Sequence, residues 1–324
     1  MNGEIMIKNI KKESFLNLIS ASALGLFLLY MYQGLGELVV AFLVFPYIVL
    51  YMSEGAKITI VSLLLTFAFG LLFLNPIILA YLALFVSITT FVMVYMIKQK
   101  MPAGRIMLYG TFIKLAFIFL VLGMAYIMED TNPIDSLRES LTFYMEQMLK
   151  TLENNLQTSA TDIQTMRLAF RQLIDQIISV LPGMLFIFSF FQVAVNFFIS
   201  LKLINRTSGP IAYISKLNLY GSGPGLRMAS MVSIVTVILL YLFNYVYLNS
   251  FVNNILLILG FFYFFNGLFL MDFSYEISGR KWMRFIVPFM LIVLLQSYVI
   301  YIVVGFIDMI FDFRRRLINS ARKK

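Results

Sequence analysis

The sequence predicts an all-α fold: a polytopic helical membrane protein with about nine spans and one amphipathic helical insert. Hydrophobic residues make up 61% of the chain and charged residues only 13%, whereas a soluble domain is about 45–50% apolar and about 25% charged. The apolar runs are mostly about 20 residues long, which is the length that crosses a bilayer as a helix. They lack the alternation of a membrane β-strand, so helices are the structure that satisfies their backbone in lipid.

The residue types that are missing exclude several kinds of chemistry. The chain has no Cys and no His, which rules out disulfides, thiol nucleophiles, histidine catalysis and the usual zinc and haem ligands. Its carboxylates do not form the close pair that hydrolysis needs. We therefore expect no enzyme activity, no catalytic residue, no metal and no cofactor. The net charge of +9 indicates orientation in a lipid bilayer rather than a nucleic-acid partner.

Five apolar runs precede the middle of the chain. The first has no small-residue cleavage site after it, so we expect it to be retained as a span. Asn75-Pro76 is a strong turn signal between the third and fourth runs, and Pro102 with Gly104 breaks the chain before the fifth. The expected spans are Phe15–Met31, Gly36–Met52, Ile58–Leu74, Ile77–Ile97 and Ile106–Met128.

The segment 129–181 is the one long run with the composition of a soluble protein. It holds eight acidic and four basic residues. Asn132 as an N-cap with Pro133 at the first helical position predicts one amphipathic helix, and Ser159 with Asp162 resembles the cap of a second. Their apolar stripes favour packing on the membrane surface or on other spans. A lid over a substrate pocket is the alternative, because long structured inserts are often functional.

The remainder of the chain alternates apolar runs with basic connections. A sixth span is expected at Ile178–Ile204, kinked or started at Pro182-Gly183. The last run exceeds the roughly 20 residues of one crossing, so a single tilted helix and a bent pair of short helices both stay open. The predicted organisation is a six-span core 1–205 that includes the insert, a basic Gly-rich loop 206–227, and a C-terminal part 228–324 with spans Met228–Leu248, Val252–Phe273 and Phe285–Phe311 and a basic tail.

The Lys and Arg residues predict the orientation in the cell membrane. With a cytoplasmic N-terminus, the basic connections fall on the cytoplasmic side and the short outer turns carry no Lys or Arg, as the positive-inside rule requires. The insert 129–181 is then extracytoplasmic. The tail conflicts with this pattern, because nine spans would place Arg314–Arg316 outside.

Lys114 is the one cation that lies well inside an expected span, since Lys202 stands at the basic end of the sixth. A charge there costs a few kcal/mol unless it is paired or reaches the interface. Gln192 and Asn196 lie one turn apart on the sixth span at a similar depth. We therefore predict a polar ligand-binding pocket formed by Lys114, Gln192 and Asn196. The alternative is that the Lys114 side chain extends to the nearby cytoplasmic interface.

Small residues recur on one face of the first span. Ala21 and Gly25 are four positions apart, and such residues let helix backbones approach closely. Contact with a neighbouring span of the same chain is one interpretation, and docking on another membrane protein is the other.

Three features occur together along the chain. They are a start of five spans, Asn132-Pro133-Ile134 at the opening of the polar insert, and the ending Gly305-Phe306-Ile307-Asp308-Met309-Ile310-Phe311-Asp312-Phe313-Arg314-Arg315-Arg316-Leu317. With these features the chain resembles, over nearly its whole length, the YybS family of uncharacterised bacterial membrane proteins, also called DUF2232.

That family is distantly similar to the substrate-binding S components of energy-coupling-factor transporters. The resemblance implies an S-component-like six-helix core with cytoplasmic ends, formed here by the first six spans, with three further spans added. S components dock on their coupling partner through small residues in the first helix, commonly A-x-x-x-A, and Ala21-x-x-x-Gly25 is a relaxed version. An energy-coupling membrane partner is thus implied.

Two functions follow from the sequence. The first is a transport-related subunit that binds a small molecule from the outer side, with the insert gating the pocket. The alternative is a membrane scaffold or regulatory protein without transport activity, which acts through the insert and the basic loops.

Overall fold

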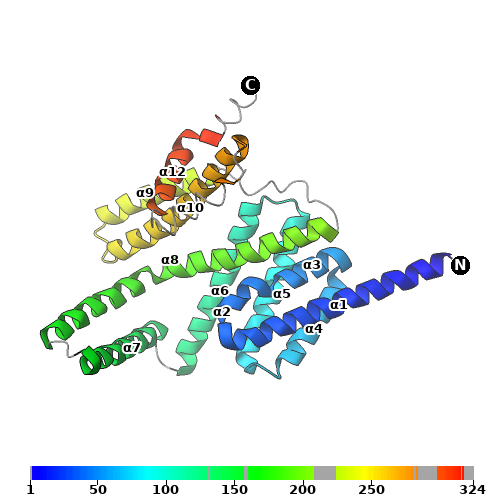
Figure 1. The fold of residues 1–324 in the computed structure, drawn as a ribbon, viewed down its shortest axis with the longest axis horizontal. Helices are drawn as coiled ribbons and strands as arrows, with labels where there is room; N and C mark the ends of the chain where they lie inside the picture. The colour runs from blue at the N-terminus through cyan, green and yellow to red at the C-terminus, as the bar shows by residue number, and fades with distance from the viewer. Residues whose placement is uncertain are drawn as a thin grey trace. The chain divides into compact units, whose positions relative to one another are not determined.

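The structure is a computed structural model that describes residues 2–129, 132–156, 160–207, 224–279, 282–283, 298–314 and 316. Every regular element in these ranges is a helix (Figure 1), which confirms the all-α fold. The helices pack as two units. Unit 1 holds α1 to α6 and α8 from Phe188 onward, and unit 2 holds α7, α8 up to Ile187, α9, α10 and α12. The loop 208–223, the stretch 284–297 and the tail beyond residue 316 lie outside the described residues.

Seven described segments are long and apolar enough to cross a membrane. Two further apolar helices are shorter, and they correspond to the third and ninth expected spans. The predicted count of nine is therefore not confirmed, although the character of a multi-span membrane protein is. The seven segments are Lys12–Leu35, Glu37–Glu54, Pro76–Lys98, Ala103–Ile127, Asp162–Arg206, Gly225–Leu242 and Leu248–Ile277.

Unit 1 is built on six helices at the start of the chain. The first packs on the next three, and the fifth packs on the third, fourth and sixth. Asn75 caps the fifth helix by accepting a 2.9 Å hydrogen bond from the N–H of Ile77, so the predicted Asn-Pro turn is confirmed. The helices are α1 (Asn2–Leu35), α2 (Glu37–Leu43), α3 (Phe45–Glu54), α4 (Ala56–Gly70), α5 (Pro76–Lys98) and α6 (Ala103–Glu129).

The second expected span is interrupted. It consists of α2 and α3, which are separated at Val44. Pro46 stands in the first turn of α3, where its missing N–H is tolerated but cannot continue the hydrogen bonds of α2. The chain enters α2 through Gly36, whose φ of +52° is a conformation that favours glycine. The segment Glu37–Glu54 is still long and apolar enough to cross a membrane. The sequence did not indicate the break, because the apolar composition runs unchanged through it.

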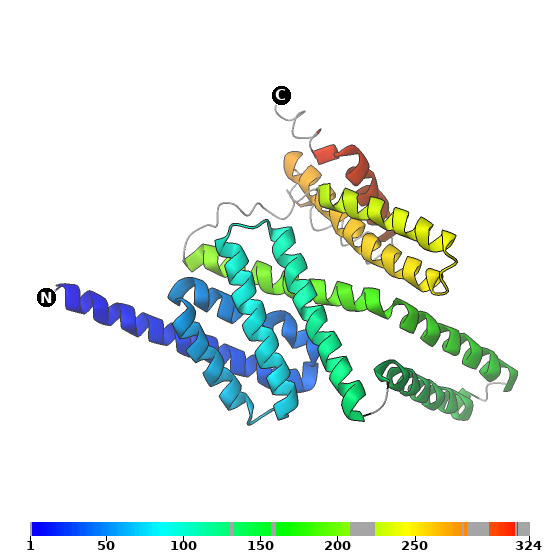
Figure 2. The same ribbon diagram turned by 180° about the vertical axis from the view of Figure 1, so that it is seen from behind.

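In unit 2, the insert forms a hairpin of two helices. α7 (Pro133–Leu156) lies alongside the first part of α8 (Ala160–Thr207) in both views (Figures 1 and 2). Arg167 and Glu146 form an ion pair of 2.9 Å between them. The two amphipathic helices and the start at Pro133 are confirmed, and Ser159 lies outside the described residues. The apolar contact joins Met145, Leu149 and Ile174 with the partly buried Leu141, Phe170 and Ile178.

The second insert helix and the sixth expected span are one continuous helix. α8 passes through Pro182, although a proline inside a helix removes one hydrogen bond and clashes with the preceding turn. The sequence left two alternatives, a span kinked at Pro182-Gly183 and a span that starts there. The structure excludes a start at Pro182, because α8 begins at Ala160.

Side chains of α10 (Leu248–Ile277) compensate for that proline. The hydroxyl of Ser250 and the amide nitrogen of Asn254 each donate to the carbonyl of Ser179 at 2.7 Å. The amide oxygen of Asn254 accepts from the N–H of Gly183 at 2.5 Å. Backbone groups freed within a membrane helix need such partners, since lipid offers none.

The C-terminal helices of unit 2 pack around a very close crossing. α9 (Pro224–Leu242) and α12 (Tyr298–Phe311) both contact α10, and Figure 2 shows α9 and α10 side by side. Gly267 of α10 and Gly305 of α12 meet where the two helices cross. A Cβ atom at either glycine would collide with main-chain atoms of the facing helix. The absence of side chains here permits contact between the two backbones.

Candidate functional site

The site in unit 1 is centred on the buried cation that the sequence singled out. Lys114 lies about 17 Å along α6, from 1.5 Å of rise per residue, and is 0% exposed. Its ammonium donates to the carboxylate of Glu37 at 2.7 Å and to the hydroxyl of Tyr81 at 2.9 Å. It also lies 4.5 Å from the ring centre of Phe85. The charge is therefore paired and stabilised by an aromatic face.

The carboxylate that pairs with Lys114 is accessible. Glu37 is the first residue of α2, where the helix dipole favours a negative charge, and its side chain is 41% exposed. The hydroxyl of Tyr32 donates to its second oxygen at 3.4 Å. Sequence analysis did not predict this pairing. The signal in the sequence was the cation inside a span, which needs either a partner or contact with the interface.

The position of Tyr81 shows toward which end of the bundle the Lys114 side chain points. Tyr81 stands in the second turn of α5, far from the end of α5 that carries Lys98. The ammonium of Lys114 therefore points away from the basic connection between α5 and α6. This geometry argues against the alternative in which Lys114 extends toward that connection, because Glu37 and Tyr81 hold the ammonium toward the opposite end of the bundle.

Asn196 holds the interrupted helix together. Its amide oxygen accepts from the N–H groups of Val44 and Phe45 at 3.0 and 2.9 Å, and its amide nitrogen donates to the carbonyl of Val40 at 3.0 Å. One buried side chain of α8 thus bonds backbone groups on both sides of the break. Each of these groups would otherwise be unpaired in an apolar surrounding, at a cost of about 1–3 kcal/mol.

Gln192 lies one turn before Asn196 and is also buried. Its amide nitrogen donates to the backbone carbonyl of Glu37. Within the described residues, its amide oxygen and the hydroxyl of Ser189 are buried without a hydrogen-bond partner. Buried polar atoms usually have a hydrogen-bond partner, so these two atoms mark a point of the site that favours a group with donors.

The three predicted residues therefore converge on α2. Lys114 contacts the side chain of Glu37, Gln192 contacts its backbone, and Asn196 contacts the end of α2. The helices that carry these residues, α6 and α8, are in close contact at Gly110. A Cβ atom at this glycine would lie only 2.6 Å from the side chain of Val193. A ligand shared by the three residues stays a prediction. Among the described residues, no group of three or more acidic side chains is placed to hold a metal ion.

The comparison with protein families gives one match. A family model described as "Predicted membrane protein (DUF2232)" matches residues 21–309, which is most of the chain. The chain belongs to the DUF2232 family. No curated protein and no solved structure matches it, so the similarity to S components of energy-coupling-factor transporters is not shown.

In this DUF2232 protein, the small residues of α1 face helices of their own unit. A Cβ at Gly25 would collide with the Tyr47 hydroxyl and lie 3.0 Å from Thr66. Ala21 is buried, and Ser22 is 2.8 Å from the Ser62 hydroxyl. This geometry agrees with contact inside the chain, and docking of Ala21 and Gly25 on a partner stays a prediction.

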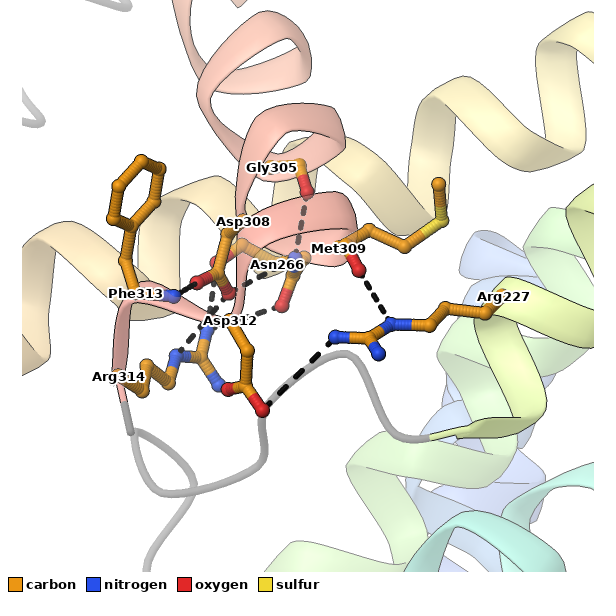
Figure 3. Close-up of polar contacts among 8 residues, drawn as sticks. All are labelled: Arg227, Asn266, Gly305, Asp308, Met309, Asp312, Phe313 and Arg314. Atoms are coloured by element: carbon orange, nitrogen blue, oxygen red, sulfur yellow. Dashed lines mark hydrogen bonds and ion pairs between the residues drawn. The ribbon is translucent and has the colours of Figure 1, made fainter. Parts of the chain in front are cut away.

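The ending that the DUF2232 resemblance singled out forms a second polar cluster (Figure 3). Asp308 of α12 is 1% exposed, and its carboxylate accepts from the N–H of Phe313 at 3.0 Å and from the amide of Asn266 at 3.3 Å. Arg314 donates to the carbonyl of Asn266 at 2.8 Å and lies 3.6 Å from Asp308. These bonds fasten the end of α12 to α10.

Proposed function

We propose that this DUF2232 protein is a membrane subunit that binds a small polar solute at Glu37 and Lys114, as the binding component of a transport system. The carrying observation is the asymmetry of the ion pair, because Lys114 is fully buried while Glu37 is 41% exposed. Ionisable residues inside a membrane usually mark the path of a solute or ion. Here the exposed carboxylate of Glu37 is the end of such a path that a solute can reach, and the buried ammonium of Lys114 lies behind it.

The interrupted helix beside the pair supports the same function. Many transporters bind their substrate where a membrane helix is broken and polar groups gather at the break. Here the break at Val44 is held open by Asn196, and Gln192 brings a second amide to the same helix. Asn196 pairs the backbone groups at the break between α2 and α3, and Gln192 bonds the first residue of α2.

The direction of binding is part of the proposal. With a cytoplasmic N-terminus, the end of unit 1 at Glu37 faces outside, because α1 crosses the membrane before it. The insert 129–181 is then also outside. A solute would be captured from the outer side, and an energy-coupling membrane partner would supply the work. No enzymatic step is proposed, because the groups for acid–base catalysis are not visible in the sequence.

The test is to identify small molecules that co-purify with the protein. Full-length protein is purified in mild detergent and denatured, and the released compounds are identified by mass spectrometry. We expect a defined solute with the wild type and with Lys98→Met, an exposed lysine on α5, and none with Lys114→Met. Equal amounts in all three samples, or no solute in any, would contradict the proposal.

The alternative function is a membrane scaffold or regulator, and the hairpin of α7 and α8 favours it. The hairpin has its own apolar contact and ion pairs, and it exposes Phe143 and Tyr144, whose rings are in edge contact. Affinity purification from membranes separates the two functions. Recovery of an ATP-driven coupling module favours transport. Recovery of other membrane proteins that is lost in the variant Phe143→Ser/Tyr144→Ser favours the scaffold.

A further inference from the structure

The charges around Lys114 restrict what can bind there. Lys114 and Glu37 neutralise each other in the absence of a ligand. A ligand that takes Glu37 away must give Lys114 a new negative partner, because an unpaired charge in the interior costs several kcal/mol. A purely cationic ligand pairs with Glu37 and leaves the fully buried ammonium without a carboxylate. Cations are therefore the least favoured class.

A purely anionic ligand satisfies Lys114 but introduces a second difficulty. Its negative charge would share the site with Glu37, and two carboxylates beside one ammonium repel each other. Such a ligand also carries only acceptors. It cannot bond the amide oxygen of Gln192, an acceptor that is buried without a partner.

The free polar atoms of the site match a ligand with both charges. An ammonium group has three donors, and within the described residues Lys114 uses two of them, toward Glu37 and Tyr81. Its third donor is available to an anionic group. The nitrogen of the Gln192 amide bonds the backbone of Glu37, so the unpartnered oxygen of that amide lies near Glu37. A positive group with N–H donors would be bound by that oxygen and by the Glu37 carboxylate.

We infer that the solute is a small zwitterion, with an anionic group bound by Lys114 and an ammonium group bound by Glu37 and Gln192. This inference rests on the proposed function. The zwitterion gives Lys114 and Glu37 one further partner of opposite charge each, and it adds no net charge to the site. Its ammonium also gives the buried Gln192 oxygen the donor that it lacks.

Matched probes that differ only in charge test this inference. One set is alanine, propionate and ethylamine, and a second is γ-aminobutyrate, butyrate and propylamine. Each probe is titrated against the purified full-length protein, and the midpoint of thermal unfolding is followed. We expect at least one zwitterion to bind about tenfold more tightly than its matched acid and amine. Lys114→Met should abolish this binding, and Lys98→Met should preserve it.

The position of the ammonium is tested by Glu37→Gln. This variant should bind the zwitterion and the matched acid with similar affinity, since it lacks the carboxylate that distinguishes them. If it does not fold, the wild-type titrations alone decide. Tighter binding of an acid or an amine than of every zwitterion, with loss in Lys114→Met, would overturn the inference and leave the proposed function standing. Absence of binding by all probes, together with no co-purified solute, would overturn both.

Discussion

The ammonium of Lys114 donates a 2.7 Å hydrogen bond to the carboxylate of Glu37, 77 positions earlier in the chain. One partner is fully buried and the other is 41% exposed. Removing Glu37 should therefore cost a different free energy of unfolding from removing Lys114. Water can solvate Glu37 when Lys114 is removed, whereas the fully buried Lys114 loses its carboxylate partner when Glu37 is removed.

We predict that Glu37→Gln destabilises the protein more than Lys114→Met. Leaving a buried charge without its partner costs about 3–5 kcal/mol, whereas the freed carboxylate of Lys114→Met is accessible to water and should cost about 1 kcal/mol or less. The double variant should recover much of the stability lost in Glu37→Gln. The free energy of unfolding in detergent is measured for the three variants. Equal losses of stability in the two single variants would contradict this prediction.

Asn196→Leu should strongly destabilise unit 1. The change leaves the N–H groups of Val44 and Phe45 and the carbonyl of Val40 without partners, at about 1–3 kcal/mol for each group. Asn17→Leu is the matched control, because Asn17 is exposed and donates to the side chain of Glu54. Denaturation of both variants is compared with the wild type. A loss no greater for Asn196→Leu than for Asn17→Leu would show that the amide does not hold the break.

Pro182 and Asn254 should be energetically coupled. Asn254→Leu removes the bonds to the Ser179 carbonyl and the Gly183 N–H and should destabilise the protein by about 1–3 kcal/mol. In a Pro182→Ala background the helix can pair these two groups itself, so the same change should cost less. A double-mutant cycle measures the difference. Additive effects would mean that Asn254 does not compensate for the proline.

The crossing of α10 and α12 should not tolerate a methyl group. Gly267→Ala and Gly305→Ala each place a Cβ against the main chain of the facing helix, and overpacking of this kind costs about 1–3 kcal/mol or more. At Gly260 the nearest atom to a new Cβ is 4.0 Å away, on Ile302, so Gly260→Ala is the control. The stability of the three variants is compared by their resistance to protease. Resistance unchanged in Gly305→Ala would rule out the close crossing.

Part of this structure was predictable from local signals. The composition predicted helices in lipid, Asn75-Pro76 predicted a turn, and Pro133 predicted the start of α7. These signals depend on residues within a few positions of one another, so no knowledge of the rest of the fold is needed to interpret them.

The remainder depends on contacts between distant residues. The break at Val44 is stabilised by Asn196, which is 152 positions away, and the run around Val44 is apolar on both sides. The continuity of α8 depends on Asn254, since Pro182 alone suggests an interruption. The sequence identified Lys114, Gln192 and Asn196 as polar residues at similar depth, but only the folded chain places Glu37 among them.

The central claim is that the Glu37 end of unit 1 opens to the outside and receives the solute there. The chain has no Cys, so single cysteines can be labelled without removing native ones. Leu35→Cys, Glu139→Cys and Gln99→Cys each replace an exposed residue. With a membrane-impermeant maleimide on intact cells, we predict rapid labelling at 35 and 139 and labelling at 99 only after permeabilisation. Labelling at 99 in intact cells, with protection at 35 and 139, would contradict the account.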